Sequence, residues 1–430
     1  MKTRGVLLAA ILLLARPSFG ATTERLELPN GLRVVVRPAP ATDIVAVELL
    51  LDVSARDEPP GKHGIRSMIQ RLLLRGTRSQ PGAQMGQRLA EVGGVADVSV
   101  GLDYAEIYAL VPSQGLETAL ELLAGAVRAP AFLPEEVEKQ RRVALDAASS
   151  ARDDAFRETY LAFRGRFYGE HPYGRDTSGD RDSLRAITRE DIVRFHDRHY
   201  RPQNAVLAIC GGVRPATAGR LARQFFGEWQ SGESFPPRPR TPPEPLQYSQ
   251  AVVREVPTRQ GHLLIGFPAP EAGQERYFVI QVIDSLLGGG SGARLNKVLR
   301  EQEGIAYQIW SFHPTLAGES HFAVYAAADP LAMERTKELI LGVLRGLCQE
   351  TVPSEELARA KRYLLGSYAL SRQRMKDQAY LLAWYEVLGL GVEFEGRYGE
   401  AVSAVTAEDV QAMANAIFRR FVVAVGLPDG

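Results

Sequence analysis

The 430 residues are long enough for at least two domains, because single domains average about 100 to 200 residues. Lysine plus arginine and aspartate plus glutamate are equal, at 51 each, so the chain lacks the basic surplus with which sequence-independent nucleic-acid-binding proteins displace counterions. We therefore expect no nucleic-acid partner. The cysteines, Cys210 and Cys348, follow apolar segments in different halves of the chain, and we expect buried free thiols, although an oxidising compartment would permit a disulfide.

The N-terminus has the pattern of a secretory signal peptide. Lys2 and Arg4 precede an apolar run at residues 6–15, and small residues follow at the positions that a signal peptidase inspects. This run is shorter than the ~20 apolar residues that span a bilayer, so we expect cleavage after Gly20. The mature protein is then expected to be periplasmic or secreted and to contain no membrane span.

Strand and helix patterns are mixed along the rest of the chain. Turn signals and period-two alternation predict strands at residues 26–28 and 32–36 around a P-N-G turn, and at 44–53, 98–111, 251–256, 262–267, 305–312 and 321–327. Helical spacing predicts helices at 64–75, 116–128, from 134 onward, and at 275–287. This mixture predicts an α+β fold in which sheets pack against helices.

The chain is internally duplicated. The sequence L-P-E-E-V at 133–137 recurs as V-P-S-E-E-L at 352–357, and I-T-R-E-D-I at 187–192 recurs as V-T-A-E-D-V at 405–410. The two offsets, 353 − 134 = 219 and 406 − 188 = 218, agree closely. So long a period predicts two homologous sheet-plus-helix domains and not a short-repeat solenoid.

A proline-rich stretch at residues 231–245 separates the two copies and is expected to be an extended spacer, because proline cannot join a helix interior or a central strand. We therefore divide the chain into a signal peptide at 1–20, an N-terminal domain at 21–230, a linker at 231–246 and a C-terminal domain at 247–430.

The predicted helix at 64–75 carries three polar residues, Ser67, Gln70 and Arg71, at i, i+3 and i+4 beside an apolar stripe. Residues 64–77, G-I-R-S-M-I-Q-R-L-L-L-R-G-T, resemble the zinc-binding helix of the pitrilysin/insulinase-like peptidases, G-x-x-H-x-x-E-H-x-x-x-K-G-T. The three polar residues stand where that family has His, Glu and His. An arginine has no lone pair to donate, a serine is a poor substitute for imidazole, and a glutamine cannot act as a general base.

The family's third ligand is also missing. Its later helix resembles E-K-x-R-x-V-x-x-E-E, and here residues 138–147 read E-K-Q-R-R-V-A-L-D-A, so the ligand position falls on Ala147. Asp146 is adjacent, but one residue along a helix turns a side chain by about 100°. We therefore expect that this chain binds no catalytic zinc.

The resemblance covers essentially the whole mature chain, including H-P-Y-G at 171–174 and H-Y-R-P-Q-N at 199–204, which is similar to the family's H-Y-x-P-x-N. It implies one half of a clam-shell, built from two homologous domains. Where the family often has N-A-x-T, this chain has D-V-S-V at 97–100.

The second half resembles the family in a glycine-rich segment. G-G-G-S-G-A-R-L at 288–295, R-E at 300–301 and G-I-A-Y at 304–307 are similar to G-G-G-x-x-S-R-L…R-E-x-x-G-L-A-Y. In two-subunit bacterial members this Arg and Tyr come from the subunit without the zinc motif, so the resemblance assigns catalytic roles to Arg294 and Tyr307. Both side chains can donate hydrogen bonds to a peptide carbonyl or an oxyanion. On pattern alone they would be an ion-pair partner and an edge aromatic.

For three other features we expect structural roles and no ligand binding. His196 and His199 lie at i, i+3, but no third ligand can be named for them. His63 precedes the helix and cannot restore an i, i+4 pair. The run Gly288 to Gly290 lacks the lysine of a phosphate loop and is expected to be a turn before a helix.

These observations favour the non-metal-binding subunit of an exported heterodimeric zinc metallopeptidase, inactive alone. Its expected partners are a peptide and a sister subunit that carries an intact H-x-x-E-H motif and the zinc. The alternative is a non-catalytic peptide-binding or structural subunit with the same fold. A weaker third hypothesis is a peptidase with a different metal site.

Overall fold

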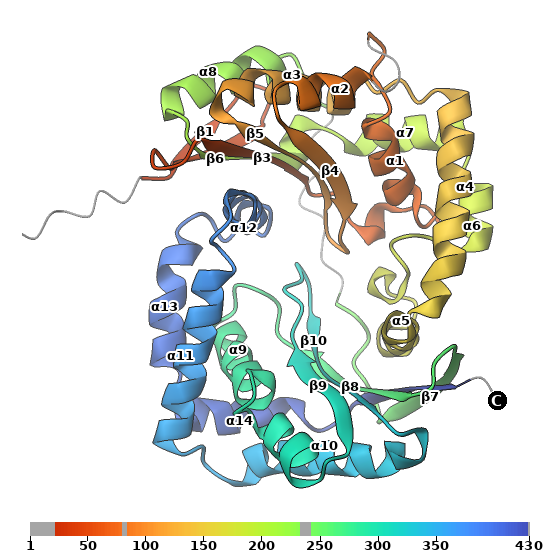
Figure 1. The fold of residues 1–430 in the computed structure, drawn as a ribbon, viewed down its shortest axis with the longest axis vertical. Helices are drawn as coiled ribbons and strands as arrows, with labels where there is room; N and C mark the ends of the chain where they lie inside the picture. The colour runs from red at the N-terminus through yellow and green to blue at the C-terminus, as the bar shows by residue number, and fades with distance from the viewer. Residues whose placement is uncertain (1–21, 80–83, 233–241, 429–430) are drawn as a thin grey trace, which may run out of the picture.

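The computed structural model describes residues 22–79, 84–232 and 242–428 and contains two mixed sheets with helices packed on them (Figure 1). This architecture confirms the predicted α+β class. The expected signal peptide and the centre of the expected linker lie outside the described residues. Within the described residues, no helix is long and apolar enough to cross a membrane.

The first sheet has the order β1-β2-β6-β3-β5-β4. Its strands are β1 (Glu24–Glu27), β2 (Arg33–Pro38), β3 (Ile44–Leu51), β4 (Val95–Val100), β5 (Ala105–Pro112) and β6 (Ala205–Gly211). β1 and β2 form the expected antiparallel hairpin. The single strand predicted at 98–111 is wrong, because Gly101 donates its backbone N–H to Tyr104 in a tight turn that splits the segment into β4 and β5.

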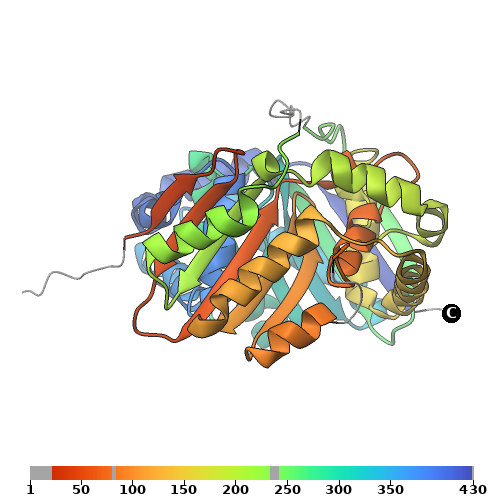
Figure 2. The same cartoon turned by 90° about the horizontal axis from the view of Figure 1, so that it is seen from above.

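Helices α1 (Ile65–Leu73), α2 (Gln84–Glu91), α3 (Leu116–Arg128) and α8 (Pro215–Phe226) lie on the outer face of this sheet, as Figure 2 shows from above. α4 (Pro134–Ser150) and α7 (Arg189–His199) pack on α1, and α6 (Arg181–Ala186) packs on α4. The apolar stripe of α1, which includes Met68, Ile69 and Leu72, is buried in the same core as Ile107 and Ala109 of β5. Amphipathic spacing therefore fixes which face of α1 is turned away from solvent.

The second sheet has the order β7-β11-β8-β10-β9. Its strands are β7 (Gln250–Val256), β8 (Gly261–Ala269), β9 (Ala306–Phe312), β10 (Ser320–Ala328) and β11 (Val422–Pro428), and its outer helices include α9 (Glu275–Gly288), α10 (Met333–Gln349), α11 (Ser354–Leu370), α13 (Phe394–Ala404) and α14 (Ala407–Ile417). The duplicated T-x-E-D sequence has the same role in both halves. Thr188 and Asp191 form a capping box on α7, and Thr406 and Asp409 form one on α14.

Each sheet is covered on its inner face by a helix from the other half of the chain (Figure 1). α12 (Met375–Val387) packs on β3 and β6 of the first sheet, and α5 (Ala155–Tyr168) packs on β7, β8 and β11 of the second. Leu50 and Ala208 share a core with Leu382 of α12. The two domains are therefore interlocked by exchanged helices, which the sequence did not predict.

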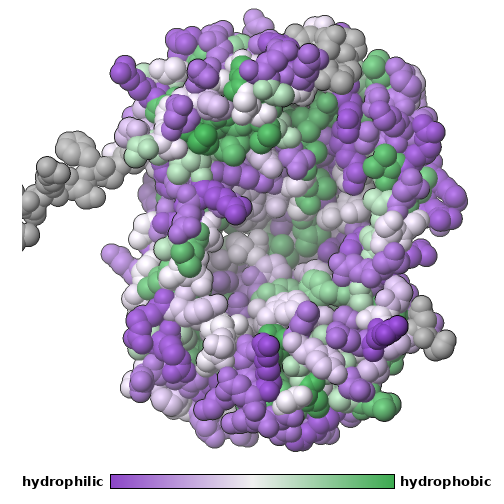
Figure 3. All heavy atoms as spheres, viewed as in Figure 1, coloured by the Kyte–Doolittle hydropathy of each residue, from purple (hydrophilic) through white to green (hydrophobic). Residues whose placement is uncertain are grey.

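Polar contacts also join the two halves of the chain. Arg25 of β1 forms an ion pair with Glu386 of α12 at 2.8 Å, and Arg33 donates to the Glu386 carbonyl at 2.7 Å. Asp103, which is buried in the turn between β4 and β5, accepts from the backbone N–H of Ala317 at 2.9 Å. Figure 3 shows a hollow between the two domains, with polar and apolar residues on its walls.

The cysteines are unpaired in the structure. Cys210 on β6 is fully buried, and burial raises the pKa of its thiol to about 12, which makes it an inert apolar residue. Cys348 on α10 is only partly buried. The expectation of free thiols is therefore confirmed for both, and that of complete burial for Cys210 alone.

Candidate functional site

The polar face of α1 is used for packing and not for metal binding. Gln70 is 1% exposed, and its Nε2 donates to the carbonyl of Glu106 at 3.0 Å and approaches that of Ser99 at 3.5 Å. An ionised glutamate at this position could not donate these bonds. Ser67 and Arg71 are partly exposed on the same helix. Gln70 therefore ties α1 to the backbone of β4 and β5.

Arg66, the residue before Ser67, also holds α1 in place through buried polar bonds, and we call its pair with Glu58 the buried clasp. It is fully buried, its Nε donates to Glu58 at 3.1 Å, and its Nη1 donates to the carbonyls of Val53 (3.0 Å), Gly101 (2.9 Å) and Tyr104 (3.1 Å). Burial raises the pKa of Glu58, and the charge and hydrogen bonds of Arg66 oppose that rise. Sequence reasoning missed this pair, whose only signal was a charged residue within an apolar helix.

The remaining ligand position also fits no metal. α4 packs against α1, as the family frame requires, but Ala147 is exposed there and carries no donor atom. Asp146 is exposed beside it. Across the residues that the structure describes, no group of three or more His, Cys, Asp or Glu side chains is arranged to hold a metal ion. The side chains at the three ligand positions, Ser67, Arg71 and Ala147, therefore do not fit zinc, and Gln70 at the fourth position cannot replace the general base.

The histidines near this region have structural partners. His63 Nε2 lies 2.5 Å from the Asp180 carboxylate at the start of α6. His196 Nε2 lies 3.0 Å from the Val127 carbonyl, and its ring stacks on Tyr200 with centroids 4.9 Å apart. Burial lowers the pKa of His199 to about 4, so this side chain is neutral at physiological pH. His63 and His196 thus hold neighbouring elements together.

Arg294 and Tyr307 lie in the C-terminal domain, on different elements, Arg294 after α9 and Tyr307 on β9. Arg294 forms a bidentate ion pair with Glu356 in the first turn of α11, with Nε–Oε1 at 2.7 Å and Nη2–Oε2 at 2.8 Å. This pairing raises the pKa of Arg294 and lowers that of Glu356. Tyr307 is 58% exposed on β9, the edge strand of its sheet. The sequence did not predict this role of Glu356.

The glycine run between α9 and the helix at Asn296–Gln302 forms a turn. α9 ends at Gly288, and Gly290 has a φ of +86°, a left-handed conformation that favours glycine. Asn296 Nδ2 donates to the Gly290 carbonyl at 3.1 Å and closes the turn. The expected turn before a helix is confirmed.

A cluster of charged groups on the inner face of the first sheet was also missed. Glu48 of β3 is fully buried and neither carboxyl oxygen has a hydrogen-bond partner in the described part of the chain. Burial, and then the negative charge of Glu106, raises the pKa of Glu48 well above its usual value. Glu106 accepts from the Ser99 hydroxyl at 2.5 Å and lies 3.6 Å from Lys376 Nζ of α12.

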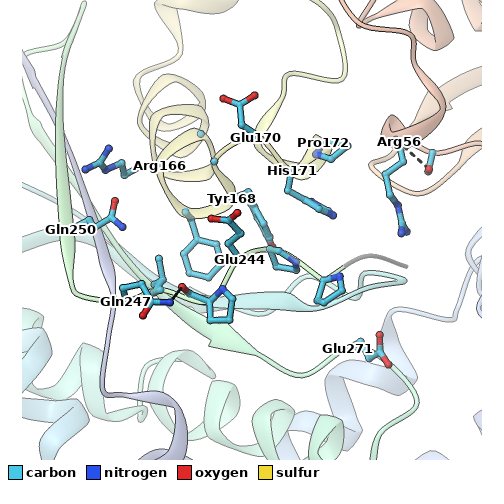
Figure 4. A pocket seen from close by; sticks show the side chains of 18 of the residues that line it. Arg56, Arg166, Tyr168, Glu170, His171, Pro172, Glu244, Gln247, Gln250 and Glu271 are labelled. Atoms are coloured by element: carbon cyan, nitrogen blue, oxygen red, sulfur yellow. Dashed lines mark hydrogen bonds between the residues drawn. The ribbon is translucent and has the colours of Figure 1, made fainter. Parts of the chain in front are cut away.

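A large cleft of about 1380 Å³ opens elsewhere, between the end of α5, residues 242–248 and the segments that follow β3 and precede β6. Figure 4 shows Arg56, Tyr168, His171, Glu244 and Glu271 around it. None of the six site residues predicted from the sequence lines this cleft. The degenerate motif and the cleft are therefore separate regions.

Two family models match the chain. Residues 33–176 match the family model described as Insulinase (Peptidase family M16), and residues 186–364 match the one described as Peptidase M16 inactive domain. The chain therefore belongs to peptidase family M16, the pitrilysin/insulinase-like peptidases, as its motifs had indicated.

Similar proteins span nearly the same length. The chain is 29% identical over 405 residues to an uncharacterized zinc protease of Mycobacterium leprae, covering 92% of this chain and 89% of the relative. A protease from Helicobacter pylori has a TM-score of 0.89 at 23% identity, covering 95% of this chain and all (100%) of that one. A peptidase M16 inactive domain from Pseudomonas fluorescens has a TM-score of 0.87 at 21% identity, with coverages of 95% and 98%. At these identities the two structures show a shared fold.

Proposed function

We propose that this chain is the non-metal-binding subunit of an exported, heterodimeric zinc metallopeptidase. The observation that carries the proposal is the replacement of all four metal-site groups by Ser67, Gln70, Arg71 and Ala147 on two helices that still pack together. The bonds of Gln70 and Arg66 stabilise this frame without metal. The zinc, which activates water for attack on the peptide bond, is assigned to the sister subunit.

In this proposal Arg294 and Tyr307 act on the peptide held by both subunits. The phenol of Tyr307 is exposed on an edge strand, where it can donate a hydrogen bond to a carbonyl oxygen. Glu356 holds Nε and Nη2 of Arg294, which leaves Nη1 as the nitrogen without a hydrogen bond to described residues. A guanidinium held by a bidentate pair keeps its orientation, so Nη1 would be presented in a fixed direction.

The test is reconstitution with a sister chain that carries an intact H-x-x-E-H motif. We expect no hydrolysis of a quenched fluorescent peptide by the mature chain alone, and hydrolysis by the complex. Arg294→Ala and Tyr307→Phe should each lower kcat/KM by about 100-fold, as removal of an oxyanion donor does. Arg276→Ala, a change of an exposed arginine on α9, is the matched control. Full activity of the isolated chain, or an unchanged kcat/KM for Arg294→Ala, contradicts the proposal.

A second candidate is a non-catalytic peptide-binding or structural subunit. It is favoured by the ion pair that occupies Arg294. Under this alternative, a stable complex forms without a metal-bearing partner, and Arg294→Ala changes no rate. Size-exclusion chromatography of the mature chain with and without the sister chain distinguishes the two candidates.

A further inference from the structure

We propose that Asp284 and Ser285, neighbouring residues near the C-terminal end of α9, are positioning residues that hold Tyr307 and Arg294 in a fixed spatial relation. This inference rests on the proposed function, because it concerns the two side chains to which that function assigns catalysis. Neither the family resemblance nor the relatives assign a role to Asp284 or Ser285.

α9 lies between the elements that carry the proposed site. It contacts β9, which carries Tyr307, and α11, which carries Glu356, the ion-pair partner of Arg294 (Figure 1). It also leads through the glycine turn at 288–290 into the helical segment from Arg294 onward. The end of α9 therefore adjoins each part of the proposed site.

Asp284 joins α9 to β9. Ser311 Oγ donates to Asp284 Oδ1 at 2.5 Å and lies 3.2 Å from the Asp284 carbonyl oxygen. A Cβ atom on Gly288 would lie 2.4 Å from Ser311 Oγ, so this close approach requires glycine. One turn earlier, Gln281 Nε2 lies 3.0 Å from Nδ1 of His313, which follows β9. The end of α9 is thus bonded to β9 and to the segment after it.

The position of Tyr307 depends on more than the pairing of its strand. β9 is the last strand of its sheet and has β10 on one side. On β9, Ala306 and Gln308 lie opposite consecutive residues of β10, so Tyr307 between them is the extra residue of a β-bulge. A bulge redirects a side chain and interrupts the ladder of hydrogen bonds. The bond between β9 and α9 therefore supplies support that the ladder lacks.

Ser285 joins α9 to α11. Its buried Oγ donates to the Ala360 carbonyl at 2.8 Å. Ala360 follows Glu356 by about one helical turn, so this bond holds the part of α11 that carries the partner of Arg294. Donors to a developing oxyanion act only at hydrogen-bond distance, so small displacements weaken them. Two adjacent residues of α9 thus set the relative positions of the Arg294 ion pair and the Tyr307 strand.

The test is a pair of double-mutant cycles in the reconstituted complex, with kcat and KM measured on a quenched fluorescent peptide. Asp284→Ala should lower kcat by about tenfold and change KM by less than about twofold, because misplaced donors weaken transition-state contacts. In a Tyr307→Phe background the same change should cost less than about twofold. Ser285→Ala should lose its effect in an Arg294→Ala background. Glu275→Gln, an exposed carboxyl at the other end of α9, is the control.

Each outcome decides the question. Asp284→Asn keeps an oxygen that can accept from Ser311, so its kcat should stay within about twofold of wild type, and a loss as large as that of Asp284→Ala overturns the role of this bond. Additive effects in both cycles leave the two residues a structural role alone and overturn the inference.

The same measurements separate this inference from the proposed function. If Arg294→Ala and Tyr307→Phe lower kcat/KM but Asp284→Ala and Ser285→Ala do not, the inference alone is overturned. If Arg294→Ala and Tyr307→Phe change nothing, the proposed function fails and the inference fails with it. Ser311→Ala removes the same bond from the β9 side and replaces Asp284→Ala if circular dichroism shows that this variant does not fold.

Discussion

The two domains share an ancestry visible in their sequences, yet they differ in how they treat the family's functional residues. In the first domain, α1 has lost the metal-binding groups, and buried polar bonds from Gln70 and Arg66 occupy the region. In the second, Arg294 and Tyr307 are retained, but Arg294 is paired with Glu356 at a partly buried position. The chemistry of the replaced residues alone shows that they cannot bind zinc. The surroundings of a retained residue are known only from the structure, because a residue that matches the family pattern can still be engaged in an ion pair.

The largest effect should come from the buried clasp in the first domain. Arg66→Ala is expected to lower the free energy of unfolding by about 3–5 kcal/mol, because it leaves the buried Glu58 without its partner. Urea denaturation followed by circular dichroism measures this. Arg71→Ala, at a partly exposed position of the same helix, should change stability by about 0.5 kcal/mol or less. If Arg66→Ala and Arg71→Ala lowered the free energy of unfolding by similar amounts, the buried pair of Arg66 and Glu58 would not be the cause of the loss.

Restoring the family's residue at position 70 should harm this chain. Gln70→Glu is expected to cost about 1–3 kcal/mol at pH 7, because an ionised carboxylate cannot donate to the Glu106 carbonyl and is buried. Because a protonated glutamate can donate, the cost should shrink as pH falls toward 4. Denaturant titrations at both pH values test this, with Ser67→Ala as the control. A variant as stable as the wild type at pH 7 would show that Gln70 is not structural.

Glu48 should make stability depend on pH. Its pKa is raised in the folded state mainly by burial, so between the unfolded value of about 4.3 and the folded value the native protein binds more protons. The free energy of unfolding should therefore fall as pH rises through this window. In Glu48→Gln the fall should be reduced, as thermal unfolding at a series of pH values would reveal. An identical pH profile for the variant contradicts this assignment.

The smallest effect on stability is expected in the second domain. Glu356→Gln should cost about 1 kcal/mol or less, because the Arg294 ion pair is only partly buried. If the pair orients Arg294 for the proposed function, the same variant should lower kcat/KM of the reconstituted complex without loss of the complex. A stability loss above 3 kcal/mol would instead assign the pair a structural role comparable with that of Arg66 and Glu58.

Local patterns predicted most of the fold. The P-N-G hairpin, the helix at 116–128 and the duplicated capping boxes all depend on residues close together in sequence, and the structure contains them. The exchange of α5 and α12 was not predictable, because an apolar helix surface does not state which sheet it covers. The turn at Gly101 was missed because alternating residues continue on both sides of it.

The candidate site, like the fold, was predictable from the sequence only in part. The inability of Ser67, Gln70, Arg71 and Ala147 to hold zinc followed from residue chemistry, and their roles as packing or surface groups followed only from the structure. Glu48 was hidden in the sequence I-V-A-V-E-L-L-L, where a single carboxyl group in a strand predicts solvent exposure. Its proximity to Glu106 and Lys376 arises from strand pairing and from a helix of the other domain.

The exchanged helices also set the order in which the protein can be completed during synthesis. The first sheet is finished when β6 emerges, but the apolar residues that face α12, including Ala46, Leu50 and Ala208, stay uncovered until Val387 has left the ribosome. Such a surface on a nascent chain invites association with chaperones or with other nascent chains. Cutting the protein between its domains would leave each half with an exposed sheet and an unattached helix.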